Sequence, residues 1–387
     1  MRKTKVLTAL AIILLIIVSV ASIVFVLYWN KLDLLQYDDG TKDQPSSIGD
    51  SSVSIKKQGD KNKSKQDPEE QGEEADKVNT QEFISDKEAA ENPGTVEDVK
   101  KPTVKPKQDD KVINLLFIGS DEATHGFSNN ANTDSIMIAS INTKTNEMKL
   151  ISLERGIGVP TSLTKFGKTN QYEWISSIIQ YGGPGLLEKM VETCFAIDIE
   201  GYVRINLQTF IQIVNSCNGV DINLTQKEAD YINNKISEGS YAVGHAKELG
   251  ITDKVQAVKT GPNHLNGETA VLYARCRYID SDWGRIQRHR NVIQSAVTSA
   301  KDLSISELNL MLNNVLPLIQ TNLTKTQISE LLLQAPSLRG KTIEQMSLPE
   351  SGTYSIMQGL YSKDMYAVDF DKNAKTLQEF IYGGDKK

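Results

Sequence analysis

Arginine residues gather in one short segment of the chain, and their chemistry indicates an anion site. Nine of the 43 basic residues are arginine, which leaves 34 lysines, yet five arginines fall within sixteen residues. A guanidinium is a planar fork that can pair with two oxygens of a phosphate or carboxylate, whereas a lysine ammonium acts as a point charge. The five are Arg275, Arg277, Arg285, Arg288 and Arg290. We interpret the segment as one side of a phosphate or pyrophosphate site.

A plainer alternative is that these arginines form surface ion pairs with neighbouring carboxylates. The carboxylates available for this are Asp280, Asp282 and Glu268. Lysine would serve such pairs equally well, so the local choice of arginine favours the anion site.

Two aspartates and a further arginine could complete such a site. Asp121 ends an apolar run, NLLFIGSD, and Asp134 opens the next one. Arg155 follows the apolar run MKLISLE and stands alone among lysines. Carboxylates at the rim of a sheet could hold a divalent cation, which would neutralise a pyrophosphate and polarise the bond to be broken. The alternative for each aspartate is a local bond to loop backbone.

The elements that must position these side chains follow from the apolar pattern. Residues 112–121 predict a buried strand, and residues 134–156 predict a hairpin of two strands joined by NTKTNE. If the hairpin forms, Asp134 and Arg155 lie at the same end of adjacent strands.

The rest of the chain alternates between helical and strand patterns. Helices are expected over residues 183–195, 207–219, 226–237, 267–275 and 285–300, with two more near 305–319 and 324–335. Thr225 and Glu228 have the spacing of a capping box. Alternating strands and helices predict a layered α/β/α domain with a central mixed sheet.

The N-terminal segment predicts a membrane anchor. Residues 6–29 form an uncharged apolar run, long enough to cross a hydrocarbon core of roughly 30 Å. Arg2, Lys3 and Lys5 precede the run, so residues 1–5 are expected in the cytoplasm and the remainder outside the cell. A cleaved signal peptide, the alternative, would have a shorter apolar core and a small-residue cleavage site.

Residues 30–110 predict a disordered, charged stalk, and residues 111–387 the folded extracellular domain. The stretches 56–77 and 100–111 are dense in charge and contain almost no large apolar residue. Such a composition cannot bury enough surface to offset the chain entropy lost on folding.

Overall charge and cysteine content exclude other classes of protein. The net charge is −6 and the isoelectric point is near 5.5, which disfavours nucleic acid as a partner. Three widely spaced cysteines do not make a disulfide framework. The chain has no CxxC or HExxH motif and no histidine cluster, so a zinc site is not expected.

Five segments in a fixed order make the chain similar to the LytR–CpsA–Psr family of bacterial envelope proteins. They occupy residues 114–121, 132–160, 168–192, 219–225 and 264–293. The short cytoplasmic tail, single anchor and external head also resemble that family.

The resemblance implies a metal-dependent phosphotransferase of a Gram-positive-type cell envelope, with pyrophosphatase activity as a potential side reaction. Such proteins move an anionic glycopolymer, a teichoic acid or capsular polysaccharide, from a polyprenyl-pyrophosphate carrier to peptidoglycan, assisted by Mg²⁺ or Mn²⁺. By motif position, the metal residues would be Asp121 and Asp134, and Arg155, Asp134 and Arg277 would be catalytic. The pyrophosphate ligands would be Arg155, Lys168, Arg275, Arg277, Arg285, Arg288 and His289. The family's lipid chain lies in an apolar tunnel, for which the helices over 183–195 and 207–214 are candidate walls; a plain core is the alternative.

Two positions depart from the family pattern. Gly156 stands where an aspartate usually follows the arginine, which removes a carboxylate near the metal or the acceptor hydroxyl. His289 stands where a glutamine often follows the last arginine, and it could donate a hydrogen bond to phosphate, best when protonated. A non-catalytic module that binds polyprenyl-pyrophosphate lipid, or an envelope-related regulator, therefore remains the alternative function. The role of Asp134, as metal ligand or as the group that orients the acceptor hydroxyl, also stays open.

Overall fold

A computed structural model gives the arrangement of most of the chain after residue 101. The described residues are 29, 31–38, 102–122, 126–129, 131–161, 172–237, 254–276, 278–300, 303–338, 341–358 and 364–383.

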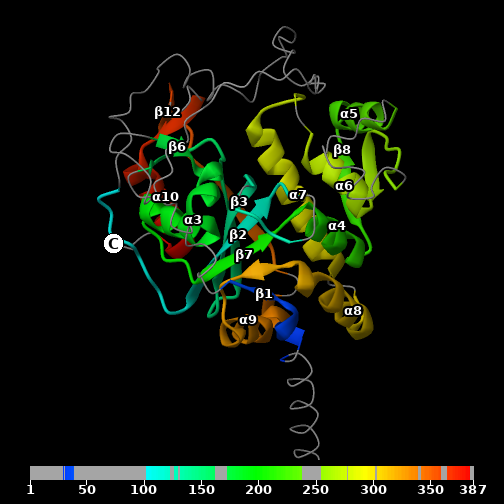
Figure 1. Cartoon of the computed structure of the whole chain (residues 1–387), viewed down its shortest axis with the longest axis horizontal. Helices are drawn as coiled ribbons and strands as arrows, with labels where there is room; N and C mark the ends of the chain where they lie inside the picture. The colour runs from blue at the N-terminus through cyan, green and yellow to red at the C-terminus, as the bar shows by residue number, and fades with distance from the viewer. Residues whose placement is uncertain are drawn as a thin grey trace, which may run out of the picture.

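A seven-stranded mixed sheet forms the centre of the molecule (Figure 1). Its strand order is β1-β10-β7-β2-β3-β4-β11. The pairs β2/β3, β3/β4 and β7/β10 are antiparallel, and β2/β7, β4/β11 and β1/β10 are parallel. The strands are β1 (Gln36–Tyr37), β2 (Val112–Ser120), β3 (Thr133–Asn142), β4 (Glu147–Leu153), β7 (Gly201–Ile205), β10 (Gln320–Thr321) and β11 (Ile343–Leu348).

One face of the sheet packs on helices α3 (Ile179–Phe195) and α10 (Phe370–Tyr382), which lie together in Figure 1. The α3 side chains Leu187, Met190, Val191, Cys194 and Phe195 are buried in this core. The apolar stripe of this helix is therefore plain core, the alternative to a lipid-binding wall.

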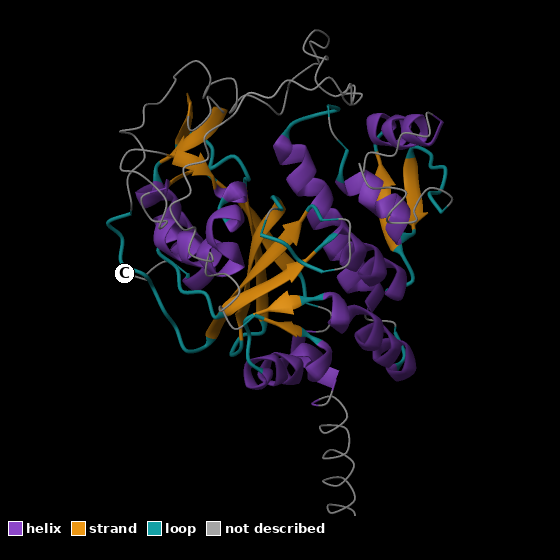
Figure 2. Cartoon of the chain, viewed as in Figure 1, coloured by secondary structure: helices purple, strands orange, loops and turns teal. Residues whose placement is uncertain are grey.

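A second core lies on the other side of the sheet, among helices and a small hairpin (Figure 2). Its closest approach is between α4 and α6, where a Cβ atom added to Gly267 would meet the Ile211 carbonyl at 2.4 Å. The elements are α4 (Leu207–Ser216), β8 (Val220–Leu224), α5 (Gln226–Ser237), β9 (Gly261–Leu265), α6 (Gly267–Ala274) and α7 (Asp282–Ala300).

The remaining elements extend these layers. They are η1 (Leu32–Leu34), β5 (Gly158–Pro160), β6 (Tyr172–Trp174), η5 (Ile175–Ser177), α8 (Ile305–Val315), η6 (Leu316–Leu318), α9 (Lys325–Leu338), β12 (Tyr354–Gln358) and β13 (Asp364–Val368). Strands β5 and β6 pair with each other, as do β12 and β13.

The predicted fold class is confirmed as a mixed α/β domain with a central mixed sheet and helices on both sides. The hairpin of residues 134–156 forms in register, with Ile136 opposite Leu153. The Thr225–Glu228 capping box also forms: Glu228 accepts from the Thr225 backbone at 2.9 Å, and the Glu228 backbone donates to the Thr225 hydroxyl at 3.3 Å.

The structure corrects the predicted stalk at its beginning. Residues 31–38 belong to the fold, because β1 completes the sheet edge beside β10 and Leu32 and Leu35 are buried. Two buried apolar side chains and backbone hydrogen bonds from Gln36 and Asp38 hold this short segment on the domain. The rest of the stalk up to residue 101 lies outside the described residues, as does the predicted membrane helix apart from Trp29. Among the residues that are described, no helix has the length and apolar character needed to span a membrane.

Candidate anion site

Three arginines converge on Asp134 at one end of the sheet. Asp134 is the second residue of β3, and Arg155 is the second residue after the neighbouring strand β4. Arg275 Nη1 lies 2.9 Å from Asp134 Oδ2. Arg155 Nη1 and Arg285 Nη1 lie 3.7 Å and 3.8 Å from Asp134 Oδ1. The predicted proximity of Asp134 and Arg155 is thus confirmed.

The two arginines from the sequence cluster reach this point from the ends of two helices. Arg275 is the C-cap residue of α6, and Arg285 lies in the first turn of α7. Their Nε groups are buried and donate to no acceptor among the described residues. The Nε groups of Arg288 and Arg290 are in the same state, so the arginine cluster as a whole has hydrogen-bonding capacity that the described residues leave unused.

Asp282 holds two of these arginines from the opposite side. Its Oδ2 lies 3.1 Å from Arg155 Nε, and its Oδ1 lies 3.2 Å from Arg285 Nη2. Although burial opposes ionisation, the Arg285 and Arg155 guanidiniums hold the pKa of Asp282 below its usual value. Asp282 is therefore ionised and fixes the orientation of both forks.

Glu154 adds a carboxyl group that carries no charge at neutral pH. Burial, and next the negative charge of Asp282, raises the pKa of Glu154 to about 8. Its Oε2 accepts the backbone N–H of Gly156. The three guanidiniums consequently face two aspartates, Asp134 and Asp282, so the cluster holds more cationic than acidic charged groups.

A cavity of about 140 Å³ opens beside Arg155. Carboxyl groups and aromatic rings share its lining, together with the backbone of Gly156. The lining residues are Glu154, Arg155, Gly156, Trp174, Asp282, Ile356, Asp364, Met365 and Tyr366.

Asp121 lies at the same end of the β2–β3 pair as Asp134. It follows β2 directly, and its Oδ1 accepts the backbone N–H of Asn132 at 3.0 Å. Within the described part of the chain, no group of three or more His, Cys, Asp or Glu side chains is arranged to hold a metal ion. Mg²⁺, however, is commonly held by one or two carboxylates together with substrate phosphate oxygens, and two aspartates fit that pattern.

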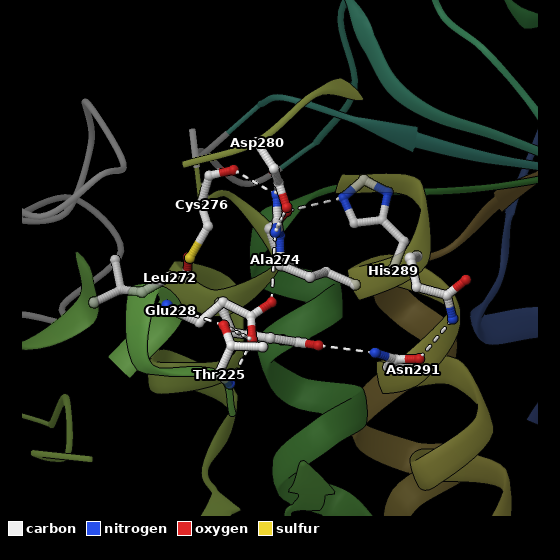
Figure 3. Close-up of polar contacts among 11 residues, drawn as sticks. Thr225, Glu228, Leu272, Ala274, Cys276, Asp280, His289 and Asn291 are labelled. Carbon is white, nitrogen blue, oxygen red and sulfur yellow. Dashed lines mark hydrogen bonds and ion pairs between the residues drawn. The ribbon is translucent and has the colours of Figure 1, made fainter. Parts of the chain in front are cut away.

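Arg288 is held within the protein. Its Nη1 and Nη2 form a two-point pair with Asp280 at 2.6 Å and 2.7 Å, and Nη2 also donates to the Cys276 carbonyl at 3.0 Å. Glu228 lies 3.4 Å from Nη1. Figure 3 shows Asp280, Cys276 and Glu228 gathered in this network. For Arg288 the structure thus shows an ion pair, as in the plainer interpretation of the cluster.

His289 has its Nε2 3.1 Å from the Ala274 carbonyl, a contact drawn in Figure 3. Burial, and next the Arg285 charge, lowers the pKa of His289 to about 4. The imidazole is therefore neutral at neutral pH and donates Nε2–H to the carbonyl, which leaves Nδ1 as an acceptor. The protonated donor expected from the sequence is not the form that this environment favours.

Of the other residues singled out from the sequence, two are outside the described part of the chain and two make contacts away from Asp134. Arg277 and Lys168 lie outside the described residues. Arg290 donates to Gln287 at 2.7 Å, and Glu268 contacts Asn215 and Lys254 rather than an arginine.

Sequence reasoning missed the part of the site that Glu154, Trp174 and Tyr366 form. A charged residue directly before Arg155, at the end of an apolar strand, was the available signal for Glu154. No local pattern could bring Tyr366, two hundred residues further along, next to Gly156, whose carbonyl accepts from the Tyr366 backbone at 2.9 Å.

The chain belongs to the LytR_cpsA_psr family, whose model matches residues 55–379. Biofilm regulatory protein A of Streptococcus mutans is 26% identical over 301 residues, covering 72% of this chain and 70% of the relative. A Bacillus subtilis relative, the polyisoprenyl-teichoic acid–peptidoglycan teichoic acid transferase TagV, is 25% identical over 278 residues, covering 70% of this chain and 65% of its own length.

Solved structures show the same fold. Protein gbs0355 of Streptococcus agalactiae superposes with a TM-score of 0.57 at 28% identity, covering 70% of this chain and 86% of that protein. TagT bound to LIIa-WTA superposes with a TM-score of 0.54 at 23% identity, covering 73% of this chain and 97% of that protein.

Proposed function

We propose that this protein is a membrane-anchored phosphotransferase that moves an anionic glycopolymer from a polyprenyl-pyrophosphate carrier to peptidoglycan. The convergence of Arg155, Arg275 and Arg285 on Asp134 carries the proposal. Two related proteins are named as teichoic acid–peptidoglycan transferases, which supports a teichoic acid or a similar anionic polymer as the transferred group.

A pyrophosphate suits the cluster in both charge and hydrogen bonding. The excess of cationic groups attracts it, and the buried Nε groups of Arg275 and Arg285 would gain the acceptors that they lack in the protein. A pyrophosphate oxygen bound beside Asp134 would replace the Asp134 carboxylate as the partner of at least one of the three guanidinium groups.

In the reaction, a sugar hydroxyl of peptidoglycan attacks the phosphorus nearer the polymer. A new oxygen–phosphorus bond forms, the bond from that phosphorus to the bridging oxygen breaks, and polyprenyl phosphate leaves while the hydroxyl proton passes to the leaving phosphate or to solvent. The forks of Arg155, Arg275 and Arg285 stabilise the charge that develops on the transferred and leaving oxygens, as preorganised cations do in phosphoryl transfer.

Asp121 and Asp134 are the residues that would hold Mg²⁺ or Mn²⁺. Two aspartates at one end of adjacent strands offer hard oxygen ligands, and the substrate phosphates would supply others. When bound, the ion would offset charge on the pyrophosphate and polarise its phosphorus–oxygen bonds.

The polyprenyl chain requires apolar surface near the sheet. Phe117 on the central strand β2 is 38% exposed, and its β7 neighbour Val203 is also partly exposed. An open apolar position on a central strand, on the face opposite the α3 core, is where a lipid chain would gain contacts. The anchor and the extracellular placement of the domain, proposed from the sequence, would keep the site near lipid-linked donors.

The test is covalent transfer by the purified full-length protein in detergent. It receives a lipid-linked pyrophosphate donor carrying a labelled polymer, peptidoglycan as acceptor, and Mg²⁺. Label that becomes attached to peptidoglycan through a phosphodiester supports the proposal, and chelation should abolish its formation.

Binding of the donor without any attached label would instead identify the alternative, a module that only presents the lipid. Gly156, which offers no carboxylate at its position, is the observation that favours this second function.

A further inference from the structure

The cavity beside Arg155 combines three features of a carbohydrate-binding site. It has aromatic rings at Trp174 and Tyr366, carboxyl groups at Glu154, Asp282 and Asp364, and little other polar surface. Sugar rings stack their C–H faces on aromatic rings and donate their hydroxyls to carboxylates. A volume of about 140 Å³ holds roughly ten water-sized groups, which is about one sugar ring.

Both aromatic rings are fixed before any ligand arrives. Trp174 Nε1 donates to the Asp364 carbonyl at 2.8 Å, and Tyr366 packs edge-on against Tyr354 with ring centroids 4.9 Å apart. The backbone N–H of Tyr366 donates a hydrogen bond to the Gly156 carbonyl, which fixes strand β13 next to the residue that follows Arg155. Preorganised rings lose little entropy when a ligand stacks on them.

Glu154 and Asp282 form a linked pair of carboxyl groups on the cavity wall. Glu154 is fully buried and shares a side-chain hydrogen bond with Asp282. The Asp282 side chain is 36% exposed, so its carboxylate is the one that a sugar hydroxyl in the cavity can reach.

Gly156 keeps the cavity open between the carboxyl group and the ring. A Cβ atom at this position would lie 3.0 Å from Glu154 Oε2 and 3.4 Å from Tyr366 Cε2. Any side chain would therefore occupy the space between the two groups that a sugar would contact.

We propose that this cavity is the acceptor subsite, which binds one sugar ring of the peptidoglycan strand beside the transferred phosphorus, with the Asp282 carboxylate receiving one of its hydroxyls. The inference rests on the proposed function and names its acceptor side. Arg155 and Asp282 belong both to the cavity and to the anion site, so a ring in the cavity has its hydroxyls next to the pyrophosphate.

The experiment uses Gly156→Ala and Glu154→Leu, which removes the hydrogen bond to Asp282, in the full-length protein, with matched controls Gly185→Ala and Glu344→Leu. A Cβ at Gly185 meets nothing within 4 Å, and Glu344 is an exposed carboxylate on β11. Two quantities are measured for each protein: the Kd for a peptide-free oligosaccharide of the peptidoglycan strand, by calorimetry, and the Kd for the lipid-pyrophosphate donor. Thermal melting confirms that each variant is folded.

We expect both cavity variants to weaken oligosaccharide binding at least fivefold and to raise the KM for peptidoglycan equally. Donor Kd should change less than twofold, and the controls should match the wild type. Weakened donor binding with unchanged oligosaccharide binding would assign the cavity to the donor's own sugar and overturn the inference. If both cavity variants bound the oligosaccharide and the donor with the wild-type Kd, the inference would be overturned as well.

The failure of the proposed function is distinguishable from these outcomes. If the wild type attaches no label to peptidoglycan, the transferase proposal fails, whereas the oligosaccharide Kd still reports directly on the cavity.

Discussion

Replacing Arg275 by alanine is the most direct test of the anion site. The change removes the 2.9 Å contact with Asp134 and one of the four buried arginine Nε donors that no described acceptor satisfies. It leaves the α6 core untouched, because Arg275 lies at the C-cap of that helix.

The expected magnitude follows from the type of contact that is lost. A hydrogen bond to a charged group contributes about 1.5–3 kcal/mol, and about 1.4 kcal/mol corresponds to a factor of ten. Loss of one fork should therefore reduce the kcat/KM of transfer by about 10- to 150-fold. Arg275→Lys, which keeps the charge but not the fork, should recover only part of this loss.

The assay measures kcat/KM with a soluble, short-chain pyrophosphate donor and peptidoglycan in excess. Arg290→Ala is the matched control, since Arg290 lies in the same cluster but donates to Gln287. Transfer by Arg275→Ala within twofold of that control, with an unchanged melting temperature, would refute the assignment of Arg275 to the pyrophosphate.

Three other predictions concern stability and the cation. Arg288→Ala should destabilise the fold by about 1.5–3 kcal/mol, because it removes the buried guanidinium that pairs with Asp280 and donates to the Cys276 carbonyl, and urea unfolding measures this. In the folded protein the pKa of Glu154 is raised from 4.5 to about 8, so the folded state keeps a proton that the unfolded state loses above about pH 5. The free energy of unfolding of the wild type should therefore fall as pH rises from about 5 through 8. Melting curves of Glu154→Gln, measured over the same pH range, should lack this decrease. Asp121→Asn should raise the Mg²⁺ concentration needed for half-maximal transfer at least tenfold, and an unchanged Mg²⁺ requirement would exclude Asp121 as a ligand.

Much of the scaffold could be predicted from the sequence, because its determinants are local. The hairpin of residues 134–156 is encoded by two apolar runs around a polar turn, and pairing them necessarily puts Asp134 beside Arg155. The capping box at Thr225 likewise depends on a spacing of three residues. Strand β1 could not be recognised in the same way, since a two-residue edge strand is held by pairing with β10, nearly three hundred positions away, and by the burial of the preceding Leu32 and Leu35.

The sequence by itself determined that this protein concentrates arginine in one short segment and that Asp134 and Arg155 share one end of a sheet. Residue type and alternation suffice for both conclusions. Only the tertiary structure decided which arginines lie beside Asp134: Arg285 meets Asp134, whereas Arg288, less than one turn further along α7, meets Asp280 and Glu228. It also decided that Glu154 is neutral, because the pKa of a carboxyl group depends on burial and on neighbouring charges contributed by distant segments.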